Sequence, residues 1–227
     1  MIGSDARPSI RDTRFWQAYD QRRYAILFYA LLLTMLIMPG VTTFGLPAVL
    51  IKLLLGVSLV AAVMPNSTRN SRWILLTAIL LLVAARAASD HGFLPVNPAV
   101  LLVLVGLTGL AAAGGALRFT IVAQSVNRET IYAALSTYLL AGVFFGQIYW
   151  SIDGIRPGSL VGPDPLSEQS AIYYSFVTLA TLGYGDFLPR TDVARGVATF
   201  EVIGGQLFLA VMVARLIGSF GAEKEEA

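Results

Sequence analysis

The stretch that decides the interpretation of this chain is Thr181-Leu182-Gly183-Tyr184-Gly185-Asp186. Its two glycines can adopt backbone conformations closed to other residues, so successive carbonyl groups need not alternate between opposite sides of the chain. A segment whose carbonyls all point one way offers a row of oxygen atoms that can replace the hydration shell of a cation. The stretch therefore predicts a binding path for a dehydrated cation.

The composition indicates a membrane protein. Of the 227 residues, 56% are hydrophobic and 13% are charged, whereas soluble domains carry about 25% charged residues. Mean hydropathy is +0.70. The chain has no cysteine and a single histidine, His91, which excludes disulfides, thiol chemistry and a zinc site built from these residues. The net charge of +2 is too small to predict a nucleic-acid partner, and no cofactor is expected.

Six segments come close to the length that an apolar helix needs to cross a bilayer, about 20 residues. They are 24–43, 46–64, 73–88, 98–117, 130–150 and 193–217. The side chains of Lys52 and Arg86 are expected to extend toward the outer membrane surface. The first apolar run is too long for a cleavable signal peptide, so we expect it to remain in the mature protein.

Basic residues before the first span predict its orientation. The five arginines are Arg7, Arg11, Arg14, Arg22 and Arg23. Such clusters stay on the cytoplasmic side of the membrane. Six spans would then leave both termini in the cytoplasm, and we expect the chain to lie in the inner membrane of the cell. Residues 9–23 also contain aromatic side chains, which fits either an interfacial helix on anionic lipid or a plain juxtamembrane anchor.

From about Arg128 to Phe220 the chain resembles the pore module of the potassium-channel superfamily. The resemblance follows an order of parts: a span, a polar loop rich in proline and glycine, a short apolar helix, the Thr-x-Gly-Tyr-Gly-Asp string and a final span. It implies an all-α integral membrane protein of bacterial type, with six transmembrane helices, a re-entrant pore helix and an extended filter loop. One such loop per chain requires a homotetramer to close a ring around K⁺ ions.

The apolar segments and the resemblance together divide the chain into four regions. These regions are an N-terminal segment (1–23), a four-helix region (24–127), a pore domain (128–220) and a short cytoplasmic tail (221–227), with no soluble ligand-binding domain. The function implied is passive, potassium-selective conduction. Three alternatives remain: a weakly selective monovalent cation channel, a potassium-uptake transporter subunit, and a non-conducting scaffold or enzyme. The last has no catalytic constellation to support it.

In similar channels the filter backbone holds the ion. The resemblance implies stacked K⁺ sites formed by the carbonyls of Thr181, Leu182, Gly183 and Tyr184. The Thr181 hydroxyl would lie at the inner end of the filter, and Gly185 would complete it. Ser167 is expected to cap a pore helix that runs from about Glu168 to Ala180. The negative end of that helix dipole would favour a cation at membrane depth.

Two tyrosines of the expected pore helix, Tyr173 and Tyr174, occupy positions where similar channels carry aromatic side chains that support the filter. We expect Tyr173 to pair with Asp186, although ordinary interfacial tyrosines are an alternative. Ala180 and Val177 depart from the threonine and glutamate of some relatives. These departures concern filter inactivation and not selectivity.

The last span contains Gly204, Gly205 and Glu201. Gly205 lies 20 residues after Gly185, at the spacing of a hinge glycine in this superfamily, but close packing against a neighbouring helix is an equal alternative. An unpaired carboxylate in a span is costly. We therefore expect Glu201 to lie behind the filter, bonded to pore-helix backbone or to a basic residue such as Arg195, in a structural role or, less favoured, as a proton sensor.

The fourth span does not look like a voltage sensor. Sensors place three or four arginines inside the membrane field, and residues 98–117 contain none. Arg118 and Arg128 lie at or beyond the cytoplasmic end. The chain is therefore not expected to be gated by an arginine sensor.

Overall fold

The structure is a computed structural model that describes residues 14–44, 98–122 and 126–225. The spans expected at 46–64 and 73–88, with Lys52, Arg86 and His91, lie outside the described residues. Six spans therefore stay a prediction.

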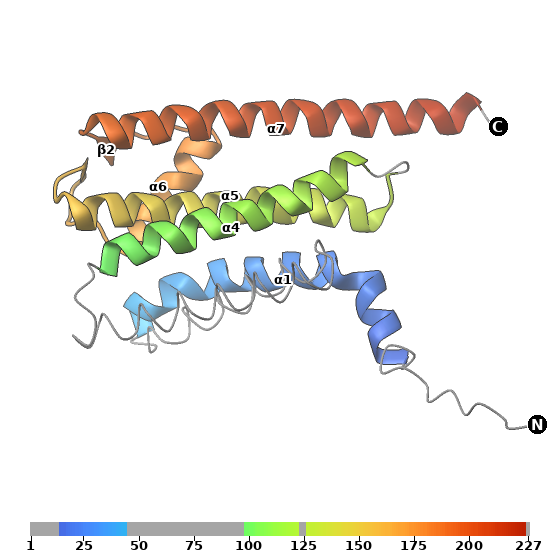
Figure 1. The fold of residues 1–227 in the computed structure, drawn as a ribbon, viewed down its shortest axis with the longest axis horizontal. Coiled ribbons are helices and arrows are strands. Elements are labelled where there is room, and N and C mark those ends of the chain that lie inside the picture. Colours follow the sequence, from blue (N-terminus) through green and yellow to red (C-terminus); the bar gives the residue numbers. More distant parts are fainter. Residues whose placement is uncertain (1–13, 45–97, 123–125, 226–227) are drawn as a thin grey trace, which may run out of the picture.

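Within the described residues the fold consists of five helices and one small sheet (Figure 1). In chain order the elements are α1 (Arg14–Phe44), α4 (Pro98–Val122), α5 (Arg128–Ile155), β1 (Leu160–Val161), α6 (Glu168–Leu179), β2 (Leu188–Pro189) and α7 (Asp192–Glu225). Helix α5 is central, because it contacts α1, α4, α6 and α7. The short α6 lies between α5 and α7 and contacts both.

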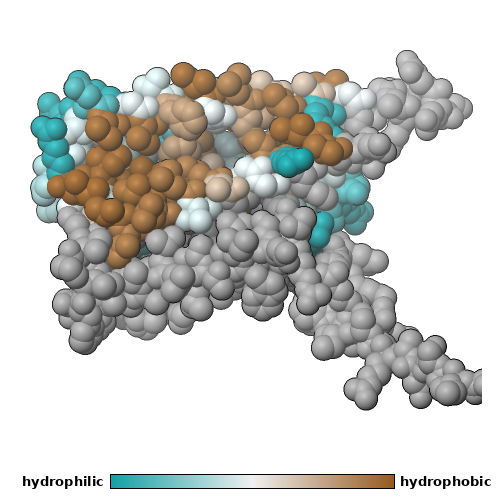
Figure 2. Space-filling model, in the orientation of Figure 1, coloured by the Kyte–Doolittle hydropathy of each residue, from teal (hydrophilic) through white to brown (hydrophobic). Residues whose placement is uncertain are grey.

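Three of the described helices are long and apolar enough to cross a membrane: Ala99–Val122, Arg128–Ile155 and Asp192–Gly218. They overlap the spans expected at 98–117, 130–150 and 193–217. Residues 24–43 lie within α1, which starts ten residues earlier, at Arg14. Figure 2 shows apolar residues over much of the described surface on this face, with hydrophilic residues gathered toward its ends. This distribution suits a surface that contacts lipid or other apolar protein.

Helix α7 continues to Glu225, so the first residues of the tail predicted from residue 221 are helical. Ala222, Glu223 and Lys224 are good helix formers, and apolar content alone cannot mark the end of a helix that they extend. The all-α prediction also missed the pairing of β1 with β2, which is antiparallel.

Small residues on α5 allow α6 to pack closely against it. A Cβ atom added to Gly142 would lie 2.4 Å from the Phe176 ring, and one added to Gly146 would lie 2.5 Å from the Ile172 Cα atom. The two glycines are four residues apart and so share one face of the helix, in the small-xxx-small pattern of membrane helix pairs. This face of α5 fixes the position of α6.

The polar loop before α6 is anchored to the segment that follows Asp186. Besides the β1–β2 pairing, the Arg190 N–H donates to the Ser159 carbonyl at 2.8 Å. The Phe187 side chain is buried, and a Cβ atom on Gly162 would lie 2.3 Å from its ring. The C-terminal end of the Thr181–Asp186 stretch is therefore held by the loop.

Candidate functional site

Helix α6 has the capping that its sequence predicts. The Ser167 hydroxyl accepts a hydrogen bond from the Ser170 N–H at 3.0 Å, and Glu168 lies in the first turn. The Glu168 carboxylate also accepts from the Gln147 side-chain amide of α5 at 2.6 Å. The helix ends at Leu179 with Ala180 as its C-cap, so its predicted bounds are confirmed to within one residue.

The backbone that follows α6 alternates in handedness. Thr181, Gly183 and Gly185 have φ angles of 58°, 56° and 79°, while Leu182 and Tyr184 do not have positive φ. Alternation of this kind turns successive peptide groups to the same side, whereas an extended strand turns them to opposite sides. Positive φ is costly for a β-branched threonine and marks a segment held in place by its surroundings.

The first two residues of this segment are bonded to the last turn of α6. The Thr181 N–H donates to the Thr178 carbonyl, and the Leu182 N–H donates to the Val177 carbonyl, each at 2.9 Å. The two bonds attach the start of the segment to the end of α6. In the single chain Leu182 and Tyr184 are 55% and 65% exposed.

The two tyrosines of α6 have different surroundings. The nearby Asp186 carboxylate raises the pKa of the Tyr173 hydroxyl, through hydrogen bonding and through its charge. The Tyr174 side chain is buried and meets the Tyr149 ring of α5 edge-on, with 4.9 Å between ring centroids. The structure thus brings the expected Tyr173–Asp186 pair together and places Tyr174 between α6 and α5.

Glu201 is fully buried, but its partners differ from those expected. Its Oε2 atom accepts a hydrogen bond from the Tyr149 hydroxyl at 2.7 Å, and its Oε1 atom accepts one from the Ser175 hydroxyl. These bonds join α7 to α5 and to α6. The prediction of a bond to pore-helix backbone or to Arg195 was therefore wrong.

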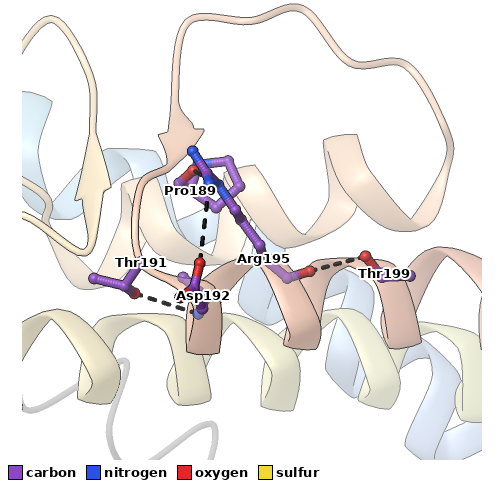
Figure 3. Close-up of polar contacts among 6 residues, drawn as sticks. Pro189, Thr191, Asp192, Arg195 and Thr199 are labelled. Carbon is purple, nitrogen blue, oxygen red and sulfur yellow. Dashed lines mark hydrogen bonds and ion pairs between the residues drawn. The ribbon is translucent and has the colours of Figure 1, made fainter.

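Arg195 instead has acceptors near the start of α7 (Figure 3). Its Nε donates to the Pro189 carbonyl at 3.2 Å, and its Nη1 lies 4.0 Å from Asp192 Oδ1. It lies six positions before Glu201 along the helix, a rise of about 9 Å. The side chain is exposed, so it remains in the polar surroundings outside the core.

The two adjacent glycines of α7 are in unlike environments. A Cβ atom on Gly205 would lie 2.7 Å from Leu179 Cδ1 and 3.1 Å from the Leu179 carbonyl oxygen, whereas one on Gly204 would meet nothing within 4 Å. Close approach to α6 thus gives Gly205 a packing reason to be glycine. A hinge at either position stays a prediction.

Sequence reasoning missed Tyr149 and Ser175. They lie 52 and 26 residues from Glu201, on other helices, and no spacing rule connects them. Within the described ranges no group of three or more His, Cys, Asp or Glu side chains could hold a metal ion. The carbonyls of 181–184 and the Thr181 hydroxyl stay the cation ligands predicted from the sequence.

Residues 134–221 match the family model described as "Ion channel". The matched family consists of ion channels, not enzymes. The matched segment begins in α5 and ends in α7, so it contains α6 and the Thr181–Asp186 stretch. No solved structure matches the chain.

Curated relatives agree with the ion-channel match. The chain is 31% identical over 87 residues to the inward rectifier potassium channel Kirbac3.1 of Paramagnetospirillum magnetotacticum, covering 37% of this chain and 27% of that protein. It is 31% identical over 93 residues to two pore potassium channel a of Oryza sativa subsp. japonica, covering 40% and 24%.

A further relative matches along most of its own length. Protein LctB of Bacillus caldotenax is 27% identical over 139 residues, which cover 56% of this chain and 95% of LctB. The matched part spans only about a quarter of each of the two potassium channels. Together the matches support a place in the potassium-channel superfamily.

Proposed function

We propose that four copies of this chain form a pore that conducts K⁺ passively and selectively across the inner membrane. The filter would consist of residues 181–185 from each copy. The observation that carries the proposal is the alternation of φ at Thr181, Gly183 and Gly185 directly after α6, between two helices of membrane-spanning length. Carbonyls turned to one side are the oxygen ligands that an unhydrated K⁺ requires.

The position of α6 supports cation binding. Its C-terminal end carries the negative end of the helix dipole and adjoins the filter. Irregular backbone at membrane depth is tolerated where protein encloses it or where it lines a water-filled path. A filter enclosed by neighbouring copies satisfies this condition.

The exposure of α7 supports assembly. Only 11% of its 18-residue apolar stretch is buried in the single chain, whereas 61% of the corresponding stretch of α5 is buried. Its large exposed side chains include Phe200, Ile203, Leu207, Val211 and Val213. Neighbouring copies around a common axis would cover part of this surface.

With further spans at 46–64 and 73–88, both termini would be cytoplasmic.

Bi-ionic recording in a planar bilayer tests selectivity. With K⁺ on one side and Na⁺ on the other, each tenfold preference for K⁺ moves the reversal potential by about 59 mV. We expect a preference of at least about tenfold, because a fixed carbonyl ring discriminates between the two ions. A reversal potential near zero would favour the weakly selective cation channel instead.

The mass of the complex in detergent tests the stoichiometry. We expect four times the chain mass of 24.4 kDa, because each chain contributes one filter loop. A conducting monomer or dimer would contradict the four-copy ring and favour a transporter subunit.

Voltage dependence is expected to be weak. The only charged residue of α4 is Arg118, four residues before its end at Val122. Each charge that crosses the membrane contributes about 2.3 kcal/mol per 100 mV, and α4 has none to move through the field. We expect open probability to change little over the physiological voltage range. Gating currents equivalent to several elementary charges per chain would show that this expectation is wrong.

A further inference from the structure

Glu201 is the only fully buried carboxylate among the residues that the structure describes. It lies within a helix of membrane-spanning length, where a carboxylate without partners would be costly. Tyr149 of α5 and Ser175 of α6 each donate a hydrogen bond to it. The carboxylate therefore joins α7, the helix that follows the filter segment, to α5 and to α6, the helix that precedes it.

A short path of two hydrogen bonds and a short stretch of helix backbone leads from this carboxylate to the filter. Ser175 lies two residues before Val177, whose carbonyl accepts the Leu182 N–H at 2.9 Å. Packed helices move as units because their interiors are dense. A change in the position of α6 at Ser175 would therefore displace the backbone that begins the filter.

Helix α7 makes a second close contact with α6 near Glu201. One turn further along α7, Gly205 lies against Leu179, the last residue of α6. Beyond this point the α7 side chains at 207, 209, 211 and 213 are exposed. Movement of the cytoplasmic part of α7 would thus reach α6 through the contacts at Glu201 and Gly205.

We propose that Glu201 is a positioning residue for the filter. Its carboxylate, held by Tyr149 and Ser175, fixes α6 against α7 and so sets the spacing of the filter carbonyls. The inference rests on the proposed function and adds Tyr149 and Ser175 to the residues on which selectivity depends. Glu201 acts through hydrogen bonds to helix side chains and does not itself touch the ion.

The test compares potassium over sodium permeability for Ser175→Ala, Glu201→Ala and Glu201→Gln in planar bilayers, with tetramer content measured by size exclusion. The first two variants remove hydrogen bonds to the carboxylate. Glutamine can keep both contacts, because its amide oxygen accepts one hydroxyl proton and its amide nitrogen donates to the other hydroxyl. Rescue by glutamine distinguishes hydrogen bonding from charge.

Ser151→Ala is the matched control. Ser151 is also a fully buried serine, but its hydroxyl donates to the Gln147 carbonyl of its own helix at 2.6 Å. Its loss removes one buried hydrogen bond without separating two helices. We expect Ser151→Ala and Glu201→Gln to keep the wild-type permeability ratio within about twofold, and Ser175→Ala and Glu201→Ala to lower it about tenfold.

The outcomes separate this inference from the proposed function. A potassium-selective wild type whose ratio is unchanged in Ser175→Ala would overturn the inference alone, as would a Glu201→Gln ratio as low as that of Glu201→Ala. A wild type without potassium selectivity would contradict the proposed function. If Glu201→Ala fails to assemble, Ser175→Ala and Glu201→Gln still decide the question.

Discussion

Gly183→Ala is expected to abolish K⁺ flux into liposomes. Gly183 has a φ of 56°, a conformation that costs alanine about 1–2 kcal/mol. Four copies multiply this cost, and relief of the strain would turn a carbonyl away from the axis. We expect flux to fall by at least about a hundredfold. The measurement is K⁺-driven flux at matched tetramer content.

Gly196→Ala is the control for that substitution. Gly196 lies in α7, without positive φ, and an added Cβ atom would meet nothing within 4 Å. The same methyl group in a helical conformation should leave flux unchanged. A Gly183→Ala tetramer that conducts like the wild type would remove Gly183 from the conduction path.

Gly146→Ala is expected to destabilise the assembled pore. Its Cβ atom would lie 2.5 Å from the Ile172 Cα atom and 3.0 Å from the Ile172 nitrogen. These are backbone atoms, so α6 as a whole would have to move. Overpacking of this kind costs about 1–3 kcal/mol in each chain. We expect a lower midpoint temperature for tetramer dissociation, or no tetramer, by thermal size-exclusion assays.

Gly114→Ala provides the comparison for Gly146→Ala. Gly114 lies in α4, and a Cβ atom added there would meet nothing within 4 Å. Its dissociation midpoint should equal or slightly exceed that of the wild type, because alanine favours helix. Equal midpoints for Gly146→Ala and Gly114→Ala would mean that close α5–α6 packing does not limit stability.

Local chemistry is what made parts of the site predictable from sequence. The bounds of α6 follow from the Ser167 cap and the Glu168 first turn, which act within a few residues of each other. The glycines of the Thr181–Asp186 stretch indicated an unusual backbone, and the positive φ of Gly183 and Gly185 agrees. Positive φ at Thr181 was not predicted, because threonine rarely adopts it.

Contacts between distant helices were not predictable in the same way. A buried carboxylate such as Glu201 needs a hydrogen-bond donor. Nothing in the sequence indicates that one donor is the Tyr149 hydroxyl, 52 residues away on α5. Arg195 looked suitable by charge, yet its place near the start of α7 keeps it in polar surroundings. The close contact of Gly205 with Leu179 likewise depends on how α6 and α7 pack.

The most direct test of the central proposal is an electron cryomicroscopy map of the chain in lipid nanodiscs containing K⁺. The account predicts a fourfold axis with ion density along it, ringed by the carbonyl oxygens of Thr181, Leu182, Gly183 and Tyr184. Carbonyls turned away from the axis, or an assembly without a fourfold axis, would contradict it.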